Sequence, residues 1–294
     1  MMDKLKIHLD LLNSIPVIDI ELSTFCNIQC NICPRGSITR GHGLMEQSTF
    51  NQLLEWLPKK SAITFSGMGE PLLNPLICNY IRQLGEKNIR VLLKTNGQLL
   101  DKEMIKHLID SGIWHIQISI QGMDKDTYES NMKGARFDLL INNLKFLSSL
   151  NNAPVSIYTI ANEITNKNGD AHLIEQLAKE YKLPFYNGKL HSRGGALYKP
   201  KSEGKISDEF ECRIFPKAVF ITWDGFILSC CHDVKGETKL GHVNNVTYKE
   251  LKAIKWNILK KSKWFSICNK CDDILRHTYC LPEHIPLKTQ KVRR

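Results

Sequence analysis

Three cysteines near the N-terminus constrain the architecture of this chain more than any other feature. They are Cys26, Cys30 and Cys33, spaced by four and three residues. Three thiolates at this spacing can ligate three corners of a cubane iron–sulfur cluster. A ferredoxin would supply a fourth cysteine just downstream, but the next cysteine is Cys78. One iron is therefore expected to stay open for chemistry, as a catalytic zinc site keeps an open position.

The sequence before the cysteine run predicts its place in a fold. Residues 17–22 form an apolar, strand-like segment, so the cysteines should lie in a loop at the carboxyl end of a strand. Binding and catalytic sites gather at this end of the strands in α/β folds. The run is therefore expected to mark a functional site.

The run also resembles the signature of a known family. Residues 24–33 read Thr-Phe-Cys-Asn-Ile-Gln-Cys-Asn-Ile-Cys and are similar to the motif of radical S-adenosylmethionine (radical SAM) enzymes. The resemblance implies a 4Fe–4S cluster on Cys26, Cys30 and Cys33, with SAM chelating the open iron through its amino and carboxylate groups. It also implies reductive cleavage of SAM to a 5′-deoxyadenosyl radical. Ile32 departs from the family, which usually has an aromatic residue near the adenine at this position.

Strand and helix signals alternate over the first two thirds of the chain. Strands are predicted at 17–22, 62–66, 91–95, 115–120, 155–160 and 185–190. Helices are predicted at 47–57, 74–86 with Asn74 as its cap, 101–109 opened by Asp101, 137–150 and 171–181. Such alternation favours a parallel sheet. Together with the family resemblance, it predicts an α/β fold, a partial (β/α)6 radical SAM barrel whose lateral opening would admit substrate.

The second predicted strand ends in a glycine-rich turn. Gly67, Met68, Gly69 and Glu70 follow it. The glycines let the backbone approach a ligand closely, and the carboxylate can accept hydrogen bonds from an ammonium group. The turn resembles the family's GGE motif, which binds the SAM amino group, although Met68 replaces a glycine. A plain turn with a helix-capping acid is the alternative.

Residues after the later strands are further candidates for the SAM pocket. The family commonly has a sequence like that around Asn96 lining this pocket. Ser119 and Gln121 are two apart and so share a face, where a hydroxyl and an amide could hold the SAM ribose. Ile160 could pack against the adenine or belong to the core. Arg193 lies beside glycines and suits a carboxylate of SAM or substrate, although a surface arginine in a turn is equally compatible.

A second set of cysteines follows a polar, turn-rich linker at residues 198–205. A hairpin at 220–230, with its turn at Asp224-Gly225, brings Cys212 close to Cys230, and Cys268 and Cys271 follow a helix at 246–260. Two plus two thiolates fit a closed tetrahedral site, and for an isolated domain the spacing favours zinc over iron–sulfur. The order of these elements resembles the twitch, or SPASM-like, extension of radical SAM enzymes, which implies an auxiliary 4Fe–4S cluster on Cys212, Cys230, Cys268 and Cys271. The predicted domains are a barrel at 1–200, a small α+β cluster-binding domain at 201–285 and a basic tail at 286–294.

Three cysteines are left outside both sets. Cys78 is expected to be a small buried hydrophobe within a helix. Cys231 is expected to point to the opposite face of the strand that carries Cys230. Cys231 and Cys280 are candidate hydrogen-atom donors to a substrate radical, and Cys280 could instead replace a ligand. His232 is expected to lie at the surface.

Composition narrows the class of protein. The 294 residues carry a formal net charge of +10, spread along the chain, which favours solvated faces over a nucleic-acid patch. No apolar run is long enough for a membrane helix, and the N-terminus lacks a signal peptide. Ten cysteines in such a chain indicate metal binding in a reducing compartment, so we expect a cytoplasmic location.

These features together predict a radical SAM oxidoreductase or epimerase. The expected substrate is a small polar metabolite of the sugar or cyclitol class, because the first predicted strand begins too early for an N-terminal peptide-recognition domain. A maturase of ribosomal peptides is the alternative, and a non-catalytic iron–sulfur scaffold or electron-transfer protein is the alternative from another class. Catalysis would also require an external electron donor such as flavodoxin or ferredoxin.

Overall fold

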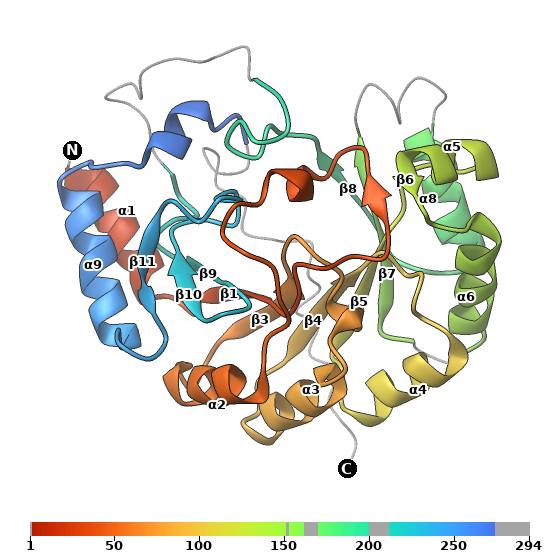
Figure 1. The fold of residues 1–294 in the computed structure, drawn as a ribbon, viewed down its shortest axis with the longest axis horizontal. Coiled ribbons are helices and arrows are strands. Elements are labelled where there is room, and N and C mark those ends of the chain that lie inside the picture. The colour runs from red at the N-terminus through yellow and green to blue at the C-terminus, as the bar shows by residue number, and fades with distance from the viewer. Residues whose placement is uncertain (1, 151–152, 162–169, 200–211, 274–294) are drawn as a thin grey trace.

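The computed structural model describes residues 2–150, 153–161, 170–199 and 212–273. Their centre is one curved sheet with the strand order β11-β10-β9-β1-β3-β4-β5-β7-β8 (Figure 1). The strands from β1 to β8 in this order pair in parallel, which confirms the predicted α/β fold with an open, partial barrel. These strands are β1 (Val17–Glu21), β3 (Ala62–Ser66), β4 (Val91–Thr95), β5 (His115–Ser119), β7 (Val155–Ala161) and β8 (Phe185–Lys189).

Amphipathic helices follow the outer side of this sheet (Figure 1). They are α2 (Gln47–Trp56), α3 (Ile77–Glu86), α4 (Lys102–Asp110), α6 (Phe137–Ser149) and α8 (Asp170–Glu180). The core lies between the two layers, where Phe50 of α2 stacks on Tyr80 of α3 with ring centroids 3.8 Å apart. Burial of this continuous apolar layer is the main stabilising contribution to the fold.

The start of α3 differs from the prediction. The helix begins at Ile77, and residues Pro71–Leu73 form a short 3-10 helix before it. Asn74 does not cap α3. Its Oδ1 accepts from the backbone N–H of Leu76, the residue before the helix, at 3.0 Å. Its amide nitrogen donates to the backbone oxygens of Leu22 and Met45, at 3.1 and 2.9 Å, and so ties this segment to the chain after β1. The predicted cap at Asp101 is confirmed, because its carboxylate accepts from the backbone N–H of Met104 at 2.7 Å.

Four further elements, two helices and two short strands, were not predicted. Helix α5 (Lys125–Asn131) follows β5, and the two-residue strand β2 (Gln29–Cys30) pairs with β6 (Met132–Lys133). Helix α1 (Met2–Asn13) lies beside α9 (Tyr248–Lys260), where Lys252 Nζ donates to Asn13 Oδ1 at 2.6 Å (Figure 1). These elements are short or depend on partners distant in sequence, so their local signals are weak.

The C-terminal segment continues the barrel sheet. β9 (Ala218–Ile221) and β10 (Phe226–Leu228) form the predicted hairpin, with Gly225 at φ +87 in its turn. β9 pairs in parallel with β1, and β11 (Lys239–His242) extends the edge beyond β10. Cys212 and Cys230 therefore flank a hairpin of the same sheet whose strand β1 leads into the N-terminal cysteine loop. Within the described residues, no helix is both long and apolar enough to cross a membrane.

Candidate active site

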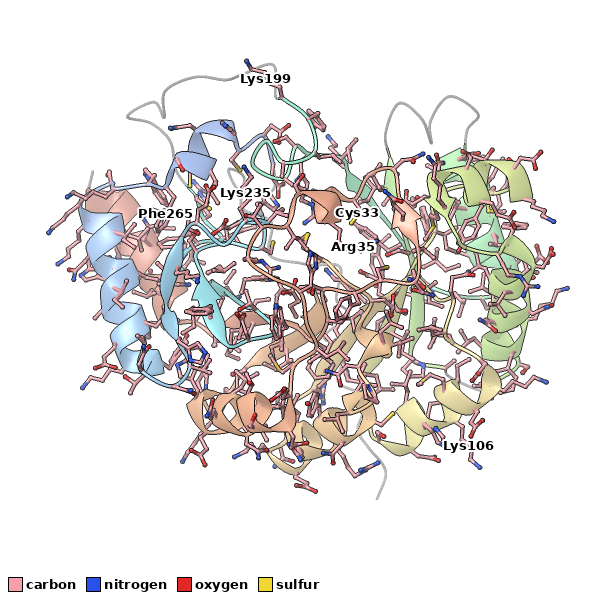
Figure 2. All side chains as sticks on the ribbon, viewed as in Figure 1. Cys33, Arg35, Lys106, Lys199, Lys235 and Phe265 are labelled. Carbon is pink, nitrogen blue, oxygen red and sulfur yellow. The ribbon has the colours of Figure 1, made fainter. Side chains whose placement is uncertain are left out.

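The three N-terminal cysteines lie in the loop after β1, as the sequence predicts. Cys26, Cys30 and Cys33 are each half-buried, and Cys30 belongs to β2. Burial raises the pKa of the Cys26 thiol and raises that of Cys30 to about 12, and the neighbouring thiols add to both shifts. The three sulfurs thus lie within electrostatic range of one another, where a cationic iron centre would stabilise their thiolate forms. Figure 2 shows Cys33 and Arg35 on this loop.

The glycine turn after β3 lies against the cysteine loop. The backbone N–H of Glu70 donates to the Phe25 oxygen at 2.8 Å. A Cβ atom on Gly69 would overlap the backbone oxygens of Ser23 and Phe25. Only glycine therefore allows this close approach of the two loops.

The side chain of Glu70 points into the protein. It is 2% exposed, and its carboxylate accepts from the backbone N–H of Asn96 at 2.9 Å and the Thr95 hydroxyl at 2.7 Å. Burial raises the pKa of Glu70 to about 7, against the opposing effect of these hydrogen bonds. The carboxylate thereby holds the end of β4 against the end of β3.

Asn96 connects β4 to the cysteine loop. Its amide nitrogen donates to Asn27 Oδ1 at 2.8 Å and lies 3.8 Å from the Cys26 sulfur. The ends of β1, β3 and β4 are thus joined by direct hydrogen bonds within one site.

The remaining SAM-pocket candidates lie at the ends of the later strands. Gln121 is buried, and its side-chain oxygen accepts from the backbone N–H of Ile160 at 3.4 Å, which links the ends of β5 and β7. Ser119 and Ile160 are half-buried at the same edge. Arg193 is half-buried in a turn at φ +54, close enough to Tyr158 to oppose the rise that burial causes in the pKa of that phenol.

The second cysteine set gathers around the end of the C-terminal hairpin. Cys212 is buried just before β9, Cys230 follows β10, and Cys268 and Cys271 lie in and after the 3-10 helix Ser266–Lys270. Backbone N–H groups donate to two of the sulfurs, from Phe215 to Cys212 at 3.4 Å and from His232 to Cys230 at 3.3 Å. Such donors favour a sulfur that carries negative charge.

Aromatic and glycine contacts bring the segments of this set together. The ring centroids of Phe215 and Phe265 lie 6.0 Å apart. Phe265, labelled in Figure 2, directly precedes the 3-10 helix. A Cβ atom on Gly194 would lie 3.5 Å from Ile267 and 3.7 Å from the His232 oxygen. The second set thus converges near the turn that follows β8.

A buried lysine lies beneath the second set. Lys255 of α9 is 1% exposed, and its Nζ donates to the backbone oxygens of Phe215, at 2.9 Å, and Ala218. Burial lowers the pKa of Lys255 to about 7, and the thiols of Cys212 and Cys230 act in the opposite direction. An anionic group on these sulfurs would restore the lysine's charge.

Arg40 links the two cysteine sets. Its guanidinium forms two hydrogen bonds of 2.7 Å with the carboxylate of Glu21, at the end of β1, and both side chains are almost completely buried. Its Nε also donates to the Val234 oxygen, in the turn after Cys230, at 3.2 Å. This bidentate pair fixes the geometry between the two loops.

Other expectations are corrected or lie outside the description. His232 is 4% exposed, not at the surface, because it packs against His191 with ring centroids 4.3 Å apart. Cys231 is half-buried but is not on a strand, because β10 ends at Leu228. Cys78 is half-buried and packs on the core from α3. Cys280 lies outside the described residues.

His191 and Asp273, which no sequence motif marks, join His232 in one group. Both histidines face the Asp273 carboxylate, with Nε2–Oδ2 distances of 3.9 Å for His191 and 3.5 Å for His232. The available signal was the position of each residue, after a barrel strand or next to a cysteine of the second set.

Comparisons with known proteins agree with this arrangement. The radical SAM superfamily model matches residues 20–168, and a model described as an iron–sulfur cluster-binding domain (SPASM) matches residues 212–272. The tungsten-containing aldehyde ferredoxin oxidoreductase cofactor-modifying protein of Pyrococcus furiosus is 30% identical over 97 residues, which are 32% of this chain and 27% of that protein. The chain covers less than two thirds of the length of the curated relatives it matches.

Two solved structures share the fold. BtrN, in complex with AdoMet and 2-DOIA, has a TM-score of 0.61 at 19% identity over 90% of this chain and 96% of that chain. Streptococcus suis SuiB, bound to the precursor peptide SuiA, has a TM-score of 0.69 at 17% identity over 95% of this chain and 74% of that chain.

The fold and the matched models define an α/β protein with two iron–sulfur modules. The chain belongs to the radical SAM superfamily and has a C-terminal SPASM/twitch-like domain. Its cofactors are 4Fe–4S clusters and SAM. The cysteine loop fits such a cluster, because its three partly accessible thiols lie close enough together to interact electrostatically.

Proposed function

We propose that the chain is a radical SAM oxidoreductase or epimerase acting on a small polar metabolite of the sugar or cyclitol class. In this proposal, Cys26, Cys30 and Cys33 hold the SAM cluster. An auxiliary cluster is held by the second set, Cys212, Cys230, Cys268 and Cys271. The observation that carries the proposal is the joining of both cysteine sets at one sheet edge through the buried Arg40–Glu21 pair.

The chain's own residues position the reaction. When bound, the reduced cluster and SAM supply a 5′-deoxyadenosyl radical that abstracts a hydrogen atom from a substrate C–H bond. Asn96, Gln121 and Ser119 orient SAM from the ends of neighbouring strands, and Ile160 packs against its adenine. The Gly67-Met68-Gly69 backbone accepts from the SAM ammonium, while Glu70 keeps this backbone in place through its buried hydrogen bonds. Precise positioning of this kind is the protein's share of catalysis.

Polar side chains at the strand ends support a hydroxylated or carboxylated substrate. Arg193 is half-buried beside the Tyr158 phenol, and the Ser192 hydroxyl is buried at the same turn. A guanidinium in such a position suits a carboxylate or a polar oxygen. BtrN, whose structure contains 2-DOIA, also supports a small-molecule substrate.

A peptide substrate is the second candidate. The likeness to SuiB bound to its precursor peptide favours it. To separate the two, the reconstituted protein is incubated with SAM, reductant and either the small-molecule or the peptide fraction of an extract from its source cells. Our proposal predicts that the small-molecule fraction raises 5′-deoxyadenosine formation above the substrate-free rate. Stimulation by the peptide fraction alone would favour the second candidate.

The fate of the substrate radical determines whether the product is oxidised or epimerised. Cys231 and Cys280 are the proposed hydrogen donors for epimerisation, while electron transfer to the auxiliary cluster would give oxidation. Turnover in deuterated water should place one deuterium at an inverted carbon only in an epimerase. Loss of product with intact SAM cleavage in Cys231→Ala or Cys280→Ala would identify the donor, and retained epimerisation in the double variant would refute both assignments.

Reductive chemistry also needs a partner. We propose flavodoxin or ferredoxin as the electron donor and the cytoplasm as the location, because ten cysteines and two iron–sulfur modules suit a reducing compartment. Reduction of the SAM cluster by either purified protein, followed by electron paramagnetic resonance, tests this partner directly.

A further inference from the structure

His191, His232 and Asp273 form a compact group where the barrel meets the second cysteine set. His191 follows β8, His232 follows Cys231, and Asp273 lies two residues after Cys271. Their side chains are only 16%, 3% and 10% exposed. Three residues from distant parts of the sequence thus place titratable side chains in one largely buried place.

The geometry of the group centres on one carboxylate oxygen. Asp273 Oδ2 lies 3.5 Å from His232 Nε2 and 3.9 Å from His191 Nε2, and the three atoms are all within 4.8 Å of one another. The imidazole rings are stacked, at an interplanar angle of 29°. The 3.9 Å between His191 Nε2 and Asp273 Oδ2 is too long for a hydrogen bond. The three atoms are close enough to one another to share a single ion.

We propose that this group binds a single divalent metal ion with tetrahedral preference, of the zinc or cobalt class. Zinc lies about 2.1 Å from imidazole nitrogen and carboxylate oxygen, so two ligands of a tetrahedral ion are roughly 3.4 Å apart. The same bond lengths in an octahedral ion give a separation of about 3.0 Å. The 3.5 Å between His232 and Asp273 matches the tetrahedral value, and His191 reaches it by a shift of about half an ångström.

Three protein ligands leave one tetrahedral position open. Two histidines and one carboxylate, with a water or substrate oxygen in the fourth position, are a ligand set found in catalytic zinc sites. Arg193 follows His191 by two residues, in the turn after β8. The ion would therefore bind a polar oxygen at the junction of the two modules.

The neighbouring carboxylate stabilises this arrangement. Asp272 accepts from the backbone N–H and the hydroxyl of Ser192, each at 2.8 Å, and from the Tyr198 hydroxyl at 2.9 Å. These bonds fasten the His191 turn to the segment that carries Asp273. Asp272 is thus used in hydrogen bonds, and Asp273 is the carboxylate that faces the imidazoles. Metal ligands are commonly held in place by hydrogen bonds of this kind in their surroundings.

One contact changes when an ion binds. The backbone N–H of Arg193 lies 3.4 Å from His191 Nδ1 and points its hydrogen at it. Ligation through Nε2 moves the ring proton to Nδ1, so the bound form gives up this contact. It is longer than the usual hydrogen-bond distance of about 2.9–3.0 Å, so its loss opposes binding only weakly.

The test uses the full chain with its clusters reconstituted, so that the cysteines are occupied. Cobalt(II) is added anaerobically, free ion is removed by gel filtration, and bound cobalt is measured by mass spectrometry and by its visible spectrum. The proposal predicts one cobalt per chain, with ligand-field bands but no sulfur-to-cobalt charge-transfer band. Asp273→Asn and His191→Gln should each weaken binding at least about tenfold. The half-buried His115 contacts Ser156 on another part of the sheet, so His115→Gln serves as the matched control and should bind as the wild type does.

Three results would overturn the proposal: no cobalt retained by the wild type, equal binding in the wild type and both variants, or a thiolate charge-transfer band. Iron content is measured in each variant to confirm that the second module is intact. If Asp273→Asn loses iron, the cobalt binding of His191→Gln tests the proposal, because His191 lies outside the C-terminal cysteine segments. The readout requires no turnover, so it is independent of the proposed reaction.

Discussion

The backbone N–H of Asn96 donates a 2.9 Å hydrogen bond to the buried carboxylate of Glu70, and this bond joins the ends of β4 and β3. The same Asn96 side chain reaches the cysteine loop through Asn27. The geometry of the site thus depends on one buried acid, Glu70.

The stability of the cluster-free protein should depend on the protonation of Glu70. Burial raises its pKa from 4.5 to about 7, so the carboxyl stabilises the fold fully below about pH 4.5 and loses this contribution as the pH rises through 7. The shift corresponds to about 3 kcal/mol. In urea unfolding between pH 4.5 and 8, the unfolding free energy of the wild type should fall as the pH rises, and Glu70→Gln should lack this part of the pH dependence. Parallel pH profiles for variant and wild type would contradict it.

Gly69→Ala should disrupt the cysteine loop, because the added methyl group overlaps the backbone oxygens of Ser23 and Phe25. We expect a loss of about 2 kcal/mol or more in unfolding free energy, and reduced iron incorporation at the first site. Gly36→Ala is the matched control in the same loop, where a Cβ atom has nothing within 4 Å. Equal iron content in the two variants would refute the close-approach argument.

Lys255→Met should lower the reduction potential of the auxiliary cluster. The buried ammonium lies near Cys212 and Cys230, and a positive charge favours the more negative, reduced cluster. We expect a decrease of roughly 60 mV or more, a tenfold change for one electron. A redox titration followed by electron paramagnetic resonance measures it, with the exposed Lys260→Met as control. An unchanged potential in Lys255→Met would show that the lysine's role is only structural.

Much of the fold was predictable because its signals are local. The strands at 62–66 and 91–95 are apolar runs of the right length, and the helix beginning after Asp101 has its own cap. The parallel pairing of β9 with β1 was not predictable, because about two hundred residues separate the strands and neither encodes its partner. Asn74 is not the cap of α3 because the helix begins three residues later, at Ile77, and the Asn74 Oδ1 accepts from the backbone N–H of Leu76, before the helix.

The candidate site divides in the same way. The spacing of Cys26, Cys30 and Cys33 can be read from the sequence alone, so this cluster site was predictable. His191 and Asp273 carry no motif, and only the packing of the β8 turn against the C-terminal module brings them to His232. Arg40 likewise has no sequence signal, although it bonds to both Glu21 and Val234.

Iron content tests the second module. The anaerobically reconstituted protein should contain about eight irons, as expected for two 4Fe–4S clusters. Removing Cys268 and Cys271 together by Ala substitution should leave about four. About four irons and one zinc bound to sulfur in the wild type would instead assign the second cysteine set to a structural zinc site.

The central claim is that the open cluster on the first three cysteines cleaves SAM. The direct measurement is 5′-deoxyadenosine formation by the reduced, reconstituted protein, compared with its Cys26→Ala/Cys30→Ala/Cys33→Ala variant. The account predicts formation by the wild type and none by the variant, which should still contain the auxiliary cluster. Absence of 5′-deoxyadenosine from the wild type, or an equal rate in the triple variant, would contradict it and favour a non-catalytic iron–sulfur protein.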